Sequence, residues 1–197
     1  MLCAVLLSLM SCLALAATAW ATPADSSFED PALPGFRFSY RQGGGKSKVQ
    51  PGRLELRQDF RQARSGKYSL SSISEFSDGL TATSMVGFAP VSGAQYSFSV
   101  SYFINSFQPG ARVSGRVTCA DGANNVLRHF FPTGVLSTGV WNTMKYEFVP
   151  PQGTAQVHLT FWLSGAMQAW IDDFTCQKIE HVQAAAQTKA GLLLSND

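Results

Sequence analysis

Gln-Tyr-Ser-Phe-Ser-Val-Ser-Tyr-Phe-Ile, residues 95–104, is the stretch that decides the fold. Its even-numbered residues are all aromatic or aliphatic, whereas serine fills most of the odd-numbered positions. Successive side chains of a strand point to opposite faces, so this pattern predicts a β-strand with one buried and one polar face. Gly93 before the stretch and Pro109-Gly110 after it are typical of turns.

The same alternation recurs along most of the chain, with no helical period between the alternating stretches. In residues 155–163, Val157, Leu159, Phe161 and Leu163 alternate with four polar or amphipathic residues, Gln156, His158, Thr160 and Trp162. Further strands are predicted at residues 54–60, 67–74, 83–88, 112–119, 125–131, 144–148 and 169–178. Many short strands without intervening helices predict an all-β fold, a two-sheet antiparallel β-sandwich of the jelly-roll type.

The two ends of the chain differ from this central part. Residues 1–21 carry no charged side chain and end in Ala19-Trp20-Ala21, which predicts a cleaved signal peptide and a secreted, extracellular protein. An uncleaved anchor is the alternative. No later stretch is long and apolar enough to span a membrane. We therefore expect a signal peptide at 1–21, a sandwich domain at 22–178 and a flexible tail at 179–197.

Two cysteines, Cys119 and Cys176, remain after removal of residues 1–21. In an oxidising compartment such a pair is a candidate disulfide. The alternative is two free thiols buried at core-facing positions of their strands.

The positive charges are unevenly distributed. The formal net charge is only +2, but nine of the fifteen Lys and Arg residues lie between Arg37 and Lys67. Such a segment is able to meet an anionic partner, or it forms a solvated loop and edge strand.

Trp162 is the leading candidate for ligand binding, because the alternation places it on the polar face of its strand beside His158 and Gln156. An exposed indole flanked by hydrogen-bonding groups suits a sugar ring. The alternative is that Trp162 packs under a loop. Further candidate ligand-binding residues are Phe103, Arg112, Arg116 and His129.

Sequence motifs for catalysis are absent. No glycosidase-like carboxylate pair and no nucleophile or zinc motif occurs, which favours a binding protein over an enzyme. Asp172-Asp173 in the last strand places one carboxylate toward the interior, where it needs either a cation such as calcium or backbone amides.

Several motifs occur together in one order: Ser27-Phe28-Glu29, Ala63 to Leu70 (ARSGKYSL), Val91 to Ser99 (VSGAQYSFS), Thr138-Gly139-Val140-Trp141, Phe148-Val149-Pro150 and Trp170 to Phe174 (WIDDF). In order and spacing they resemble the carbohydrate-binding modules of the galactose-binding-like jelly-roll group, family 4/9 and 22 type. The resemblance covers roughly residues 26–178.

The resemblance implies a structural calcium ion held by Glu29, Asp172 and a backbone oxygen near Lys67, and a cleft that includes His158. It also implies a non-catalytic module that binds a polysaccharide, which the basic segment suggests is anionic. We further expect the secreted protein to be a monomer. Nucleic acid is not an expected partner. Two alternatives stay open: a structural or adhesion protein without a sugar site, and a polysaccharide-degrading enzyme such as a lyase acting on an anionic polymer.

Overall fold

The computed structural model describes residues 28–30, 32–33, 35–42 and 54–179. The predicted signal peptide and all but the first residue of the predicted tail lie outside these ranges. The described residues contain no helix that could cross a lipid bilayer.

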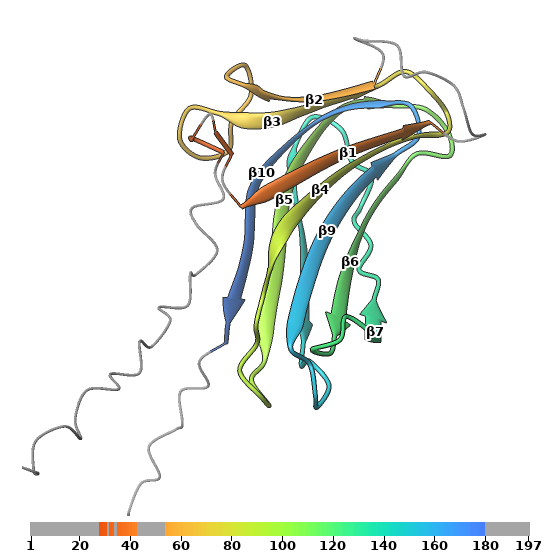
Figure 1. Cartoon of the computed structure of the whole chain (residues 1–197). Helices are drawn as coiled ribbons and strands as arrows, with labels where there is room; N and C mark the ends of the chain where they lie inside the picture. Colours follow the sequence, from red (N-terminus) through yellow and green to blue (C-terminus); the bar gives the residue numbers. More distant parts are fainter. Residues whose placement is uncertain (1–27, 31, 34, 43–53, 180–197) are drawn as a thin grey trace, which may run out of the picture.

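Ten antiparallel strands form two five-stranded sheets (Figure 1). Sheet A has the order β1-β4-β9-β6-β7 and lies in front in Figure 1, whereas sheet B has the order β2-β3-β10-β5-β8. The strands are β1 (Phe36–Gln42), β2 (Leu54–Asp59), β3 (Ser69–Ser74), β4 (Gly79–Phe88), β5 (Tyr96–Phe107), β6 (Arg112–Ala120), β7 (Val126–Phe130), β8 (Trp141–Phe148), β9 (Gln156–Ser164) and β10 (Met167–Lys178). The predicted fold class, a two-sheet antiparallel sandwich, is confirmed.

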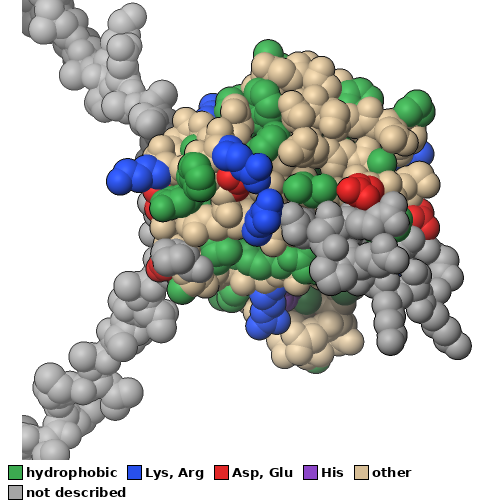
Figure 2. All heavy atoms as spheres, turned by 90° about the horizontal axis from the view of Figure 1, so that it is seen from above, with side chains coloured by type: hydrophobic (Ala, Val, Ile, Leu, Met, Phe, Trp, Pro, Cys, Tyr) green, Lys and Arg blue, Asp and Glu red, His purple; other side chains and the backbone are tan. Residues whose placement is uncertain are grey.

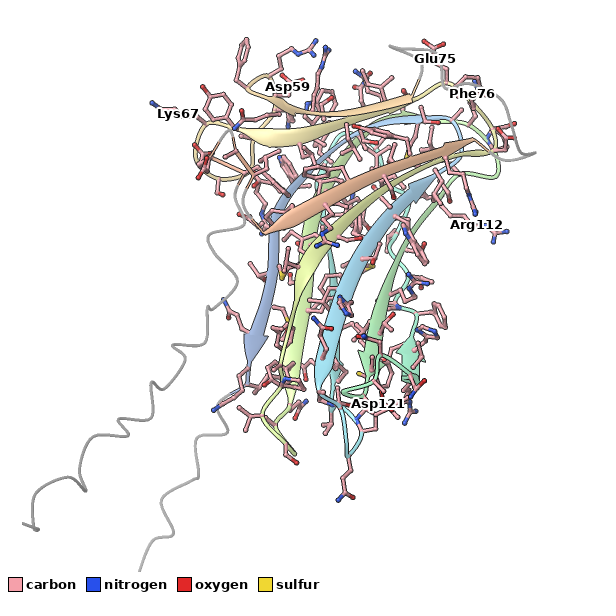
Figure 3. All side chains as sticks on the ribbon, viewed as in Figure 1. Asp59, Lys67, Glu75, Phe76, Arg112 and Asp121 are labelled. Atoms are coloured by element: carbon pink, nitrogen blue, oxygen red, sulfur yellow. The ribbon has the colours of Figure 1, made fainter. Side chains whose placement is uncertain are left out.

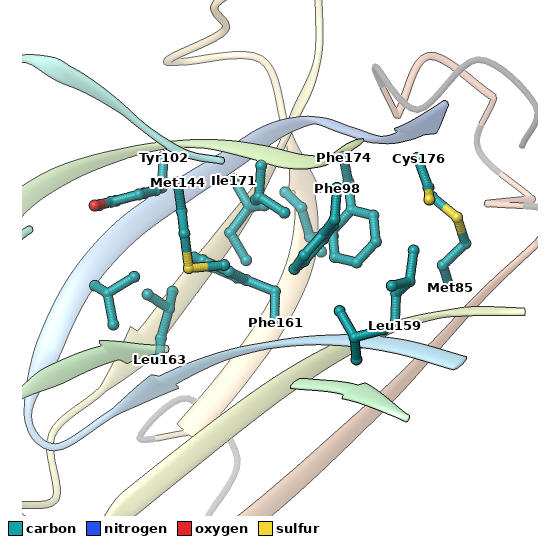
Figure 4. Packing of buried hydrophobic residues seen from close by; sticks show 14 of the residues in the cluster. Met85, Phe98, Tyr102, Met144, Leu159, Phe161, Leu163, Ile171, Phe174 and Cys176 are labelled. Atoms are coloured by element: carbon teal, nitrogen blue, oxygen red, sulfur yellow. The ribbon is translucent and has the colours of Figure 1, made fainter. Parts of the chain in front are cut away.

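The core lies between the two sheets, where the inward residues of alternating strands meet (Figure 4). Phe98 and Tyr102 of β5 are 0% exposed, as are Val100 and Ile104 on the same face. From the opposite sheet, Phe161 of β9 packs its ring 5.7 Å from that of Tyr102. Burial of each such side chain contributes roughly 2 to 3 kcal/mol, so this apolar layer is the main force that holds the sheets together.

Every strand predicted from the alternating pattern is present, but β1 was missed. Phe36 and Phe38 pack against the core, and Arg37 and Arg41 are exposed on the other side. The alternation therefore holds in β1 as well. Its alternating run, Phe36 to Tyr40, is only five residues long and continues into the Gly-rich basic segment, so the sequence gives only a weak strand signal there.

A β-bulge in β10 corrects the predicted faces of the last strand. Asp172 pairs with Ser101 and Thr175 with Ser99, so one extra residue is inserted on β10. Asp173 takes up this residue with a left-handed backbone, φ 48°. Ile171 and Phe174 consequently both face the core, whereas strict alternation puts them on opposite faces.

Candidate functional site

The outward face of sheet A is organised in straight rows, because the register across four of its five strands, β1, β4, β9 and β6, is continuous. Side chains that share a row come from positions paired across neighbouring strands. The first row is Arg37, Ser84, Thr160 and Arg116; the second is Ser39, Ala82, Trp162 and Ser114; the third is Arg41, Leu80, Ser164 and Arg112.

The outer face of sheet A is hollowed at two places. We call the three rows, together with the residues that line these two hollows, the sheet A groove. A hollow of about 330 Å³ lies over the first row and is lined by Arg37, Arg116, His158 and Gln156, among others. A second hollow of about 290 Å³ lies over the third row, where Arg41 and Arg112 line it. Arg112 extends away from the sheet into solvent (Figure 3).

Trp162 stands in the middle row, with small residues on both neighbouring strands. The guanidinium of Arg116 lies 4.9 Å from the centroid of its ring, which is a cation–π contact. One face of the indole is therefore occupied by Arg116. Arg116 also lines the first hollow, so Trp162 helps to hold the Arg116 guanidinium at that hollow.

The Nε atom of Arg116 is buried and has no hydrogen-bond partner among the described residues. A buried polar group without a partner costs free energy, more so when it is charged. The stacking on Trp162 offsets part of this cost and holds the guanidinium in place. The remaining N–H groups of Arg116 are the donors that this side chain can offer to a ligand.

His158 and Gln156 form one end of the groove. A register shift between Met85 and Phe88 brings Gly87 of β4 under both side chains. A Cβ atom on Gly87 would lie 2.6 Å from His158 Cε1 and 2.9 Å from Gln156 Nε2. The glycine is thus required for the observed position of these two side chains.

His129 lies on β7, one strand further out. Its Nδ1 is 3.1 Å from the Thr118 hydroxyl, and Thr118 is paired with His158 across β6 and β9. The structure therefore brings six of the seven predicted ligand-binding residues to one sheet face.

Phe103 is the exception, because it belongs to β5 in sheet B and cannot line the same groove. Its ring packs 5.8 Å from that of Trp141 and 6.0 Å from that of Trp170. This aromatic cluster explains the outward orientation of Phe103 without a ligand.

Arg37 and Arg41 are groove residues that were not among the predicted binding residues. They face the groove because β1 pairs with β4 at the edge of sheet A. The alternation of Phe36, Phe38 and Tyr40 with these arginines was the signal that could have identified them.

The residues predicted to bind calcium instead fix the loop of residues 63–68 through backbone hydrogen bonds. Glu29 Oε1 accepts hydrogen bonds from the backbone N–H groups of Lys67 and Tyr68, at 2.8 Å each. Asp172 Oδ2 accepts from Arg64 N at 2.8 Å and Ser65 N at 3.1 Å.

The carboxylate oxygens that the resemblance assigns to calcium accept backbone N–H groups here, so their negative charge already has partners without a cation. Arg64 adds a positive charge nearby, with its Nε 3.7 Å from Asp173 Oδ2. The described residues also contain no group of three or more His, Cys, Asp or Glu arranged to hold a metal ion. Calcium binding stays a prediction, and the hydrogen bonds of Glu29 and Asp172 argue against it.

Cys119 and Cys176 are free and buried, so the disulfide prediction is wrong and the free-thiol alternative holds. The two residues lie in different sheets, on β6 and β10. Burial raises the pKa of both thiols, to about 12 for Cys176, and a hydrogen bond with Thr154 partly offsets the effect at Cys119. Each sulfur therefore behaves as a small core side chain.

No sequence profile of a known protein family matches this chain. No curated protein matches it either.

Solved structures do share the fold. The CBM22-1 xylan-binding domain of Paenibacillus barcinonensis Xyn10C is 15% identical, with a TM-score of 0.55 over 79% of this chain and 92% of that domain. TmCBM61, solved with β-1,4-galactotriose, is 15% identical, with a TM-score of 0.54 over 80% and 98%. At these identities the likeness establishes a common sandwich fold.

The enzymatically active domain of bacteriophage CBA120 tailspike protein 4 is also similar. It has a TM-score of 0.59 at 10% identity, over 79% of this chain. This chain spans only 20% of that structure.

Proposed function

We propose that this protein is a carbohydrate-binding module that holds a polysaccharide in the sheet A groove. The observation that carries the proposal is the grouping of Arg116, His158 and Gln156 around the first hollow, with Trp162 stacked on Arg116. Sugar sites combine such aromatic support with a few convergent hydrogen-bonding groups. The fold is shared with modules that are described as binding xylan or were solved with a galactan fragment.

A non-catalytic role is part of the proposal. Glycoside hydrolysis generally uses two carboxyl groups that flank the scissile bond. None of the strands of sheet A contains an aspartate or glutamate, and Asp78, in the lining of the second hollow, is the single carboxyl among the described residues that line either hollow. We therefore propose binding without cleavage; secretion is proposed separately, from the character of residues 1–21, as is a monomeric state.

The test is a polysaccharide array, with neutral and anionic polymers, probed with the wild-type chain and the Trp162→Ala variant. We expect saturable binding that falls by about tenfold or more in the variant, because loss of the indole also releases Arg116. Trp141→Ala is the matched control, since Trp141 is a partly exposed tryptophan on the outer face of sheet B.

Equal losses in the two tryptophan variants would argue against the sheet A groove. Absence of binding by a folded sample would favour the structural or adhesion alternative. Release of reducing or unsaturated ends from any polymer would contradict the non-catalytic role and favour the degrading enzyme.

A further inference from the structure

The two sheets carry different charge. The five strands of sheet A contain five arginines and no acidic residue, in addition to His129 and His158. The five strands of sheet B contain five acidic and three basic residues. Figure 2 shows a Lys or Arg side chain next to a histidine on the side of the molecule that sheet A forms.

Four of these arginines have a regular arrangement. Arg37 and Arg116 are the two ends of the first row, and Arg41 and Arg112 are the two ends of the third row. Four residues along a strand span about 13 Å, and three steps between neighbouring strands span about 14 Å. The Cα atoms of the four arginines thus mark the corners of a near-square, with Trp162 on one of the two strands inside it.

Among the described residues, Asp78 is the one acidic residue that lines either hollow, and it forms no ion pair with Arg41 or Arg112. In the described part of the chain none of the four arginines forms an ion pair, and Arg116 Nε is buried without a hydrogen-bond acceptor. A neutral ligand over this face would desolvate the guanidinium groups without replacing their lost water contacts by a charged partner. An anionic ligand supplies that partner, and guanidinium groups bind carboxylates and sulfates in a bidentate manner.

We propose that the sheet A groove takes a polysaccharide whose sugar units carry carboxylate or sulfate groups. Anionic groups on one part of the polymer pair with Arg37 and Arg116, and those on another part with Arg41 and Arg112. The sugar rings between them cross the row of Trp162. This inference rests on the proposed carbohydrate binding and adds the chemical class of the ligand.

The experiment compares polymers that differ only in charge. Affinity of the full chain is measured for polygalacturonate and for the same polymer after full methyl esterification, and likewise for dextran sulfate and unmodified dextran. We expect binding to at least one charged polymer, a loss of about tenfold or more for its neutral partner, and weakening as salt is raised.

Variants then assign the charge effect to the groove. Arg37→Gln combined with Arg116→Gln should weaken binding by about tenfold or more, because both cations line the first hollow. The matched control combines Arg57→Gln with Lys145→Gln, which removes the same charge from sheet B. That control should bind as the wild type does. Thermal unfolding verifies that all variants are folded.

Each alternative result has a distinct meaning. Equal binding to charged and neutral partners, still dependent on Trp162, would overturn the anionic ligand and leave the carbohydrate-binding proposal intact. Equal weakening by the control pair, or equally tight binding of single-stranded DNA, would show general attraction of polyanions and overturn the inference. Binding to no polysaccharide would overturn both proposals.

Discussion

At the scale of single residues, two carboxylates show how the chain satisfies buried charge. Glu29 and Asp172 lie far apart in sequence, yet both accept backbone N–H groups of residues 64–68. Asp172 is 0% exposed and accepts a further hydrogen bond from Asp173 N at 2.8 Å. Such bonds replace the water that a buried carboxylate loses. They therefore tie the loop to the first described residues and to the last strand.

Asp172 predicts an unusual dependence of stability on pH. Burial raises the pKa of its carboxyl from 3.8 to about 6 in the folded chain, despite the backbone hydrogen bonds that lower it. The folded state then holds the proton more tightly than the unfolded state. The resulting stabilisation is complete below pH 3.8 and is lost as the pH rises through 6. A difference of about two pKa units corresponds to a loss of about 3 kcal/mol in the free energy of unfolding.

Urea unfolding of the wild type and Asp172→Asn between pH 3.5 and 7.5 measures this contribution. The wild type should lose stability relative to the variant as the pH rises, because the amide does not titrate. Glu147→Gln removes an exposed carboxyl on β8 and serves as the control. A constant difference between wild type and Asp172→Asn over this range would show that the pKa is unchanged on folding.

At the scale of elements, an irregularity in β4 determines the shape of one end of the groove. Gly87→Ala adds a methyl group 2.6 Å from His158 Cε1 and 2.9 Å from Gln156 Nε2, so both side chains have to move. The variant keeps every charge of the groove. We expect it to lose about 1 kcal/mol or more of binding free energy, with little change in Tm because the displaced side chains are not core residues.

Titration calorimetry with the polysaccharide that the wild type binds measures this effect. Gly122→Ala is the control, since a Cβ there meets nothing within 4 Å. Unchanged affinity of Gly87→Ala would show that His158 and Gln156 do not contact the ligand.

How much the sequence could predict also differs by element. The alternation of β5 and β9 follows from a period of two, which holds wherever one face of a strand is buried. The faces of β10 could not be derived in this way, because the bulge at Asp173 depends on contacts with residues 64 and 65. Likewise, the alternation predicts that Phe103 points away from the core, but it does not predict to which of the two sheets Phe103 belongs. The order of the strands determines which residues line the groove. That order depends on pairing between strands that are distant in sequence, which the alternation does not reveal.

At the scale of the whole molecule, the outer faces of the two sheets differ. Sheet B packs an aromatic cluster and the loop of residues 63–68 on its outer face, whereas sheet A leaves its outer face open and basic. The apolar layer between them joins a largely covered sheet to one whose outer face is open. Because that layer contains Cys119 and Cys176 as free thiols, the sheets associate through packing and a few hydrogen bonds, such as the one between Ser72 and Thr81, and not through a disulfide.

Because no disulfide joins Cys119 to Cys176, a reducing agent should leave thermal stability unchanged. A disulfide between Cys119 and Cys176 would stabilise the fold by about 4 kcal/mol, and its reduction would lower Tm by about 8 to 16 °C. With free thiols, Tm should be the same with and without dithiothreitol. Alkylation in denaturant without reductant should modify both cysteines, as read by mass spectrometry of the peptides that contain them. A lower Tm in reductant, together with protection of both cysteines from alkylation, would mean that a covalent bond supplements the packing between the sheets.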